Sequence, residues 1–334
     1  MNRRERVTAA LRHSEVRPVP FSVGFTQQEH DKVAAYLGDA GFTERINNHI
    51  SSTYYDGHLR EIRPDYWQDD FGVLWNRTGA DKDIGVIEGI VIPEPDMSGY
   101  VFPEIDREQI HREYQALMAR PDDTFKFGSI GFSLFERAWT LRGMENLLTD
   151  MVLEPDFVDS LLQAILTYNL QIIDIALQHD IDGFHFGDDW GQQKGLIMGP
   201  QYWRRFIKPV LAVMYGRVRS TGKFVSQHSC GDIHEILPDL IDIGLNVYQT
   251  VQPEIYDLPA LKREYGRDLS FWGCISTQRL LPFATPDEVR RVTGETLRLM
   301  GSGGGYIAAP THSIPGDVPP ENVMAMLEIL HDQP

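Results

Sequence analysis

Short apolar runs recur along most of the chain, and each ends in glycine or in polar side chains. Runs of four to six residues rich in β-branched and aromatic side chains are typical of strands buried in a parallel sheet. Eight such runs are predicted as strands, at residues 18–23, 71–75, 125–130, 182–187, 223–228, 245–248, 269–272 and 304–308.

Amphipathic stretches separate most of these runs. The clearest is 155–179, where Phe157, Leu161 and Ile165 recur at a helical spacing and Pro155 stands at the favoured first position. Further helices are predicted at 2–13, 27–38, 41–49, 107–120, 142–151 and 286–300, whereas 78–105 is expected to be irregular.

Regular alternation of strands and helices indicates a parallel sheet. Eight such units favour a (β/α)8 TIM barrel over an open, doubly wound sheet. The predicted fold class is therefore α/β. Residues 1–334 are expected to form a single barrel domain with an N-terminal helical extension.

Composition narrows the classes of partner. With 42% hydrophobic residues, the 334-residue chain can bury a large core, and a formal net charge of −17 argues against a nucleic-acid partner. No apolar run reaches about 18 residues, the length of a membrane-spanning helix. Two distant cysteines and the absence of a secretory leader predict a cytoplasmic protein.

Polar side chains gather where the predicted strands end, which is where a barrel of this kind carries its active site. Three carboxylates are the catalytic candidates, with roles in proton transfer or substrate orientation: Asp188, Asp189 and Glu136. The substrate-binding candidates are Arg137, Trp190, Gln192, Gln249, Gln252 and Gln278. Simpler roles stay open, because one aspartate could cap a helix and Glu136 could pair with Arg137 at the barrel rim.

A metal site is predicted at the end of the fifth strand. His228 and Cys230 are two residues apart, so an extended backbone places both side chains on one face. Imidazole and thiolate are zinc ligands. His312, just past the last strand, is the preferred third ligand, and Cys274 is the weaker candidate. Three ligands leave one position open, as in catalytic zinc sites. The alternative is that the cysteines are small apolar fillers.

Several motifs together resemble the uroporphyrinogen decarboxylase superfamily over nearly the whole chain. They are Gly187-Asp188-Asp189-Trp190-Gly191, Pro200-x-x-Trp203-x-x-Phe206-x-x-Pro209, His228-Ser229-Cys230-Gly231, 271–278 and 304–310 with 319–323. The resemblance implies a (β/α)8 barrel enzyme, with a homodimer as the expected assembly.

The superfamily contains a cofactor-free decarboxylation of uroporphyrinogen III. That branch has an arginine-rich motif after the first strand, which binds substrate carboxylates. The corresponding stretch here, 22–28, has no arginine, although Asp188 or Asp189 matches an aspartate that contacts the pyrrole nitrogens.

The second chemistry of the superfamily is methyl transfer by zinc enzymes that act with corrinoid proteins. Their His-x-Cys motif is matched by His228 and Cys230, and His312 stands where they have a cysteine ligand. The leading hypothesis is therefore a zinc-dependent methyltransferase or demethylase that acts on a small methylated substrate or thiol with a corrinoid partner. The alternatives are a metal-free decarboxylase of a porphyrinogen or smaller acid, other metal-assisted chemistry, and a non-enzymatic binding protein.

Overall fold

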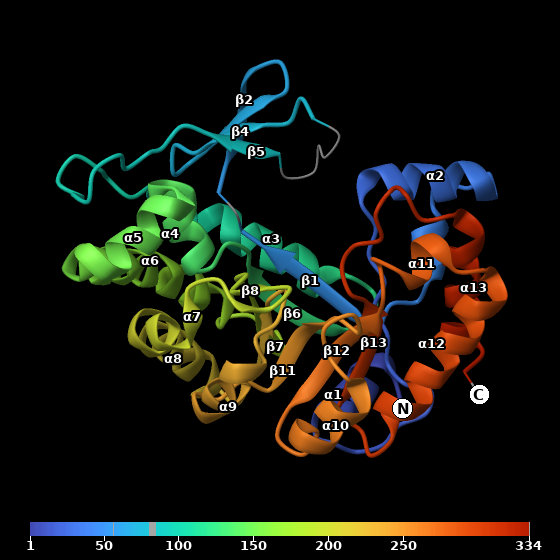
Figure 1. Ribbon diagram of the computed structural model, residues 1–334. Helices are drawn as coiled ribbons and strands as arrows, with labels where there is room; N and C mark the ends of the chain where they lie inside the picture. Colours follow the sequence, from blue (N-terminus) through green and yellow to red (C-terminus); the bar gives the residue numbers. More distant parts are fainter. Residues whose placement is uncertain (56, 80–84, 334) are drawn as a thin grey trace.

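Seven parallel strands form the central sheet of the computed structural model, which describes residues 1–55, 57–79 and 85–333 (Figure 1). Every neighbouring pair is parallel, so all carboxyl ends lie at one edge, and the order of the strands in the sheet follows their order in the chain. The α/β class with a curled parallel sheet is thus confirmed. The strands are β1 (Ile50–Tyr54), β6 (Phe125–Ile130), β7 (Gly183–Gly187), β10 (Phe224–His228), β11 (Val247–Val251), β12 (Ser270–Ile275) and β13 (Tyr306–Pro310).

Helices follow the strands and surround the sheet in Figure 1. The predicted helix at 155–179 is confirmed as α6, which begins at its proline. The helices between and after the strands are α3 (Arg107–Ala119), α4 (Phe135–Arg142), α5 (Met144–Leu153), α6 (Pro155–Ala176), α7 (Gly199–Tyr202), the π-helix η2 (Trp203–Ile207), α8 (Lys208–Arg219), the 3-10 helix η3 (His234–Ile236), α9 (Leu237–Asp242), α10 (Leu258–Tyr265), α11 (Leu280–Phe283), α12 (Pro286–Gly301) and α13 (Pro320–His331).

The N-terminal helix α1 (Arg3–Leu11) closes one end of the curled sheet. A capping box between Asn2 and Glu5 begins it. Its apolar residues Val7 and Leu11 pack into one cluster with inward-facing side chains of the strands. Since those strand residues include Phe125 and Trp272, aromatic rings fill the interior below the polar strand ends.

The first predicted strand, 18–23, is not a regular strand, so the eight-stranded barrel is confirmed only in part. Phe21 forms an isolated parallel bridge with Ala308 of β13, and its carbonyl accepts the backbone N–H of His49 just before β1. The segment therefore touches both edges of the sheet. Pro18 and Pro20 have no backbone N–H to donate to a neighbouring strand. On the β1 side, the side chains of Asn48 and His49 form hydrogen bonds with the backbone of Phe21 and Val23 in place of a regular ladder.

The stretch predicted as a barrel strand at 71–75 is not part of the barrel, and only Leu74 and Trp75 of it lie in a strand, β4 (Leu74–Asn76). That region belongs to a separate antiparallel sheet inserted between β1 and α3, at the top of Figure 1. The second strand of the main sheet is instead β1, which pairs with β6. The inserted strands are β2 (Leu59–Arg63), β3 (Tyr66–Asp69), β4 (Leu74–Asn76) and β5 (Val86–Glu88).

Smaller differences complete the comparison with the predicted elements. Helix α2 (Gln27–Leu37) is confirmed, but 41–49 contains only the 3-10 helix η1 (Phe42–Arg45). The predicted irregular stretch 78–105 contains β5, and its residues 80–84 lie outside the described residues. A short hairpin of β8 (Gly191–Gln192) and β9 (Gly195–Leu196) follows β7. Among the described residues, no helix has both the length and the apolarity needed to cross a membrane.

Candidate active site

Three potential metal ligands converge at the carboxyl ends of β7 and β10. One ligand atom each of Asp189, His228 and Cys230 lies within 4.8 Å of the other two. The Nε2 atom of His228 is 3.3 Å from Oδ1 of Asp189 and 3.5 Å from Sγ of Cys230. The parallel register places His228 directly beside Gly187, so the residues that follow the two strands meet in space.

The loop after β10 is held on several sides. The backbone N–H of Cys230 donates to Oδ1 of Asp189 at 2.7 Å, and that of Gly231 donates to Oε1 of Gln252 at 2.7 Å. The hydroxyls of Tyr248 and Tyr256 donate to the carbonyls of Ser229 and Gly231. These contacts fix the thiol of Cys230 relative to the imidazole.

Two glycines allow this loop to approach the β8 hairpin. A Cβ atom at Gly231 would lie 2.2 Å from the carbonyl carbon of Gly191, and Gly231 has a φ of +78°. A Cβ atom at Gly191 would lie 2.6 Å from the carbonyl oxygen of Cys230. Both positions therefore require glycine.

Hydrogen bonding presents Nε2 of His228 to the cluster. Its Nδ1 bonds Oε1 of Gln249, which favours the tautomer whose lone pair is on Nε2. Burial opposes the charge on His228, but Asp189 and Cys230 outweigh it and raise its pKa well above the ordinary value. Burial also disfavours the charge on Asp189, but its bonds to His228 and to the Cys230 backbone lower its pKa overall.

Asp188 points away from this cluster and is completely buried. Its carboxylate accepts the backbone N–H groups of Leu134, Phe135 and Glu136, at 3.3, 2.9 and 2.7 Å, and the indole N–H of Trp190 at 2.6 Å. Burial raises its pKa to about 6, against the opposing effect of these donors. Asp188 therefore ties β7 to the first turn of α4, as an N-terminal cap does.

Glu136 is the other acid beside the cluster. It stands in the first turn of α4, which Asp188 holds in place. Burial, followed by the charges of Asp188 and Asp189, raises its pKa to about 8. A carboxyl group with such a pKa is protonated in a large fraction of molecules at neutral pH and can transfer a proton.

Arg137 is engaged in a structural ion pair. Its Nη1 atom lies 3.0 Å from Oδ2 of Asp69, both side chains are buried, and its guanidinium stacks over Phe71 at 4.0 Å. Trp75 adds an indole hydrogen bond to the same carboxylate. In this arrangement Arg137 fastens the inserted sheet to α4.

The remaining predicted substrate-binding residues differ in exposure: two are buried, Gln249 is partly buried and two are exposed. Trp190 is completely buried and packs edge-on against Trp203, and Gln252 holds Gly231, so both support the loop. Gln249 contacts His228. Gln192 and Gln278 are exposed. The substrate-binding roles of these residues stay predictions.

Neither of the other two predicted ligands lies in the cluster. His312 is exposed, with its ring centroid 6.4 Å from that of His228. Cys274 is almost fully buried on β12, where burial raises its thiol pKa strongly. Asp189, which was predicted as a catalytic residue, is the third potential ligand in the cluster, the role predicted for His312. The ring of His312 nevertheless lies near that of His228.

Sequence reasoning missed His185, which lies inside β7. Its Nδ1 atom is 2.9 Å from Oγ of Ser226, and its ring packs edge-on toward that of His228 at 6.5 Å. Burial lowers its pKa to about 3, so it is neutral. The sequence did carry a signal for this residue, the alternation of side chains along a strand. Gly183, His185 and Gly187 alternate with two phenylalanines and so share one face of β7.

Comparison with known proteins identifies the family and a solved structure of the same fold. The matched curated relative, a uroporphyrinogen decarboxylase of Legionella pneumophila (strain Corby), is 36% identical over 76 residues. The match spans 23% of this chain and 21% of the relative's length. A solved methyltransferase from Methanosarcina mazei superposes with a TM-score of 0.75 at 17% identity, covering 99% of both chains, which shows a shared fold. The family model for uroporphyrinogen decarboxylase (URO-D) matches residues 131–333, more than half of the chain. The chain therefore belongs to the uroporphyrinogen decarboxylase family.

Proposed function

We propose that the protein is a zinc-dependent enzyme of methyl transfer, with the metal held by His228 and Cys230. The observation that carries the proposal is the cluster of Asp189, His228 and Cys230 at the carboxyl ends of the strands. Nitrogen, thiolate and carboxylate together form a donor set that suits zinc. Asp189 is the third donor in the observed arrangement, and His312 remains the alternative.

Zinc bound there would lower the pKa of a thiol or hydroxyl group of the substrate and favour its nucleophilic form. The chain itself supplies the surroundings. Gln249 orients the imidazole of His228 through Nδ1, and the loop contacts at Gly231 hold the thiol. Glu136, which Asp188 holds beside the cluster, is the group to accept or return a proton at its carboxyl oxygens.

The proposed substrate is a small methylated molecule or a thiol, and the proposed methyl carrier is a corrinoid on a partner protein. The similarity in fold to the Methanosarcina methyltransferase, over nearly the full length of both chains, supports this class of reaction. The absence of arginine from 22–28 and the pairing of Arg137 with Asp69 argue against a polycarboxylate substrate.

The alternative is metal-free decarboxylation, and one observation favours it. A carboxyl group with a pKa of about 8, as in Glu136, can protonate the carbanion that loss of CO2 leaves. In that case the cluster would be a hydrogen-bonded network without metal.

Metal analysis of protein purified without chelator or affinity metal tests the proposal. We expect about one zinc per chain in the wild type, loss of the metal in Cys230→Ser and retention in the matched control Cys274→Ser. Substitution with cobalt(II) should give a thiolate charge-transfer band that only the Cys230 variant lacks. If the wild type and both variants bind no metal even when zinc is offered, the zinc proposal is wrong.

Activity assays then separate the two reactions. Methyl transfer from a methylated substrate to a corrinoid or thiol acceptor should require zinc and should be abolished by His228→Ala. Zinc-independent release of CO2 that survives Cys230→Ser but not Glu136→Gln would instead support the decarboxylase.

A further inference from the structure

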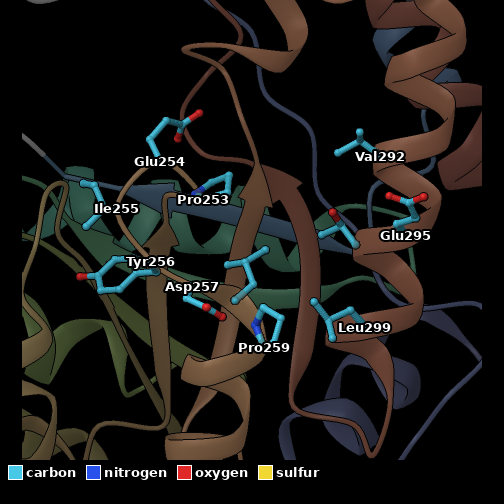
Figure 2. A pocket seen from close by; sticks show the side chains of 11 residues that line it. Pro253, Glu254, Ile255, Tyr256, Asp257, Pro259, Val292, Glu295 and Leu299 are labelled. Carbon is cyan, nitrogen blue, oxygen red and sulfur yellow. The ribbon is translucent and has the colours of Figure 1, made fainter.

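The inner face of the curled sheet, rather than its outer side, leads to the metal cluster. The groove of about 650 Å³ in Figure 2 lies on the outer side, between the segment after β11 and helix α12, and none of Asp189, His228 and Cys230 lines it. On the inner face, α1 and the rings of Phe127 and Trp272 close the end opposite the cluster. The way into the interior is therefore from the carboxyl ends of the strands.

A polar layer lies below the cluster on this inner face. Strand register places Ser129 of β6 and Ser226 of β10 on either side of His185 in β7. The Oγ atom of Ser226 lies 2.9 Å from Nδ1 of His185. The hydroxyl of Ser129 donates to the carbonyl of Thr53 at 3.2 Å. Both serine hydroxyls are therefore engaged, and the imidazole is the polar group of the layer that can still form a hydrogen bond.

The Nε2 atom of His185 is unpaired and accessible. It has no hydrogen-bond partner among the described residues, and unlike the unpaired Nε1 of Trp272 it is not sealed from solvent. The bond to Ser226 accounts for Nδ1 alone, so a ligand in the interior can bond Nε2.

The surroundings of His185 suit an uncharged partner. The centroid of its ring lies 5.4 Å from that of Trp272 and 6.5 Å from that of His228. No carboxylate contacts it in the described part of the chain, and His228 is neutral when it binds a metal. A charged group buried here would have no opposite charge beside it, which is costly, whereas a hydroxyl group needs only the hydrogen bond.

Glycine at position 187 leaves the space between the cluster and His185 open. Gly187 lies two residues after His185 in β7, directly beside His228 of β10, and it is partly exposed. Its φ is not in the left-handed region, and a Cβ atom there would come no closer than 3.4 Å to an atom outside its chain neighbours, the Cα of Gly131. The fold therefore tolerates a side chain here, in contrast to the two loop glycines. A ligand that reaches from the cluster to His185 would occupy the place of that missing side chain.

We propose that the substrate of the cluster extends past Gly187 into the interior of the sheet, where its far end carries a hydroxyl or another uncharged polar group that forms a hydrogen bond with Nε2 of His185. His185 then determines substrate specificity, because it selects this end of the molecule. The inference rests on the proposed function, since it takes the metal cluster as the site that binds the reacting end.

Binding of small thiols to the cobalt(II)-loaded protein tests this inference. A probe thiolate that binds the cobalt adds charge-transfer absorption, which gives a Kd for each probe. The probes are 2-mercaptoethanol, 3-mercapto-1-propanol and 4-mercapto-1-butanol, each compared with the alkanethiol in which a methyl group replaces the hydroxyl. The hydroxythiol of matching length should bind at least about fivefold more tightly than its partner, because its hydroxyl reaches His185. Equal affinities within every pair, or no binding of either kind of thiol, would overturn the inference.

Two variants assign the preference to the interior. His185→Phe keeps an aromatic ring but removes its nitrogen atoms, so the preference for the hydroxythiol should disappear while the alkanethiol affinity is retained. Gly187→Ala should weaken the preferred hydroxythiol at least about fivefold without loss of metal. The matched control Gly216→Ala, in α8 with no atom within 4 Å of the added Cβ, should bind like the wild type. A preference that survives His185→Phe would contradict the proposal, and so would unchanged binding in Gly187→Ala even if His185→Phe does not fold.

The results separate this inference from the proposed function. Protein that binds no cobalt contradicts the metal site, and the inference falls with it. Protein that binds cobalt and thiols but does not distinguish hydroxythiols from alkanethiols contradicts only the role of His185 and leaves the metal site intact.

Discussion

The backbone N–H of Glu136 donates a 2.7 Å hydrogen bond to Oδ1 of Asp188, so a buried carboxylate after β7 fixes the first turn of α4. The adjacent Asp189 faces the opposite way and contacts His228. Two neighbouring aspartates thus have different tasks. One positions Glu136, and the other belongs to the metal cluster.

Asp188→Asn should destabilise the fold while leaving the metal in place. An amide has only one acceptor oxygen for the four donors that now bind the carboxylate, and its NH2 group would face some of them. We expect a loss of about 2–4 kcal/mol in the free energy of unfolding, measured by urea denaturation. Zinc content per folded chain should match the wild type, and its loss would contradict the positioning role.

Asp189→Asn and His312→Ala distinguish the two candidates for the third ligand. If Asp189 completes the cluster, Asp189→Asn should weaken zinc binding by at least about tenfold, because a charged donor is lost. His312 is exposed and lies outside the cluster, so His312→Ala should have a smaller effect. Competition with a chromogenic chelator gives both affinities, and the reverse ranking would assign the metal to His312 instead.

Arg137→Met tests whether this arginine stabilises the fold or binds the substrate. Removing one partner of a buried ion pair leaves Asp69 charged and unpaired, so we expect a loss of about 3–5 kcal/mol in the free energy of unfolding. The double variant Arg137→Met/Asp69→Leu should lose less than the sum of the single changes. A variant of unchanged stability but raised KM would show that Arg137 serves the substrate.

His49 should make the fold sensitive to mild acid. Burial, followed by the charges of Arg6 and Arg3, lowers its pKa from 6.5 to about 4. Above pH 6.5 the ring is neutral in both the folded and unfolded states, so it contributes no pH dependence there. Between pH 6.5 and 4 the unfolded chain takes up a proton that the folded state resists, so stability falls as the pH falls.

We expect this histidine to account for a loss of about 2 kcal/mol in the free energy of unfolding between pH 7.5 and pH 5. His49→Gln should show a correspondingly smaller loss over the same interval in urea denaturation. Identical pH dependence in the wild type and the variant would show that His49 takes up a proton in the folded state.

Strands with apolar sequences were predictable within a few residues, and those with polar sequences were not. β6 and β12 are buried along their whole length, so their apolar side chains predict a strand from the sequence alone. β1 reads Ile-Ser-Ser-Thr-Tyr, and only Ile50 and Ser51 are buried. Its strand conformation comes from the backbone ladder with β6, which no local pattern encodes. Conversely, 71–75 reads as a buried strand because Phe71, Val73 and Trp75 are buried in the hydrophobic core, although only Leu74 and Trp75 lie in a strand.

The sequence by itself determined the α/β class, the polar carboxyl ends of the strands and the pairing of His228 with Cys230. These features depend on local periodicity and on the alternation of side chains along one strand. The tertiary structure decided which other residues join them. Asp189 meets His228 because β7 and β10 pair in one register, and Asp188 turns away because the N-terminus of α4 offers it three N–H donors. Contacts between distant segments depend on strand register and on packing, and neither can be read from the local pattern of side chains in one sequence.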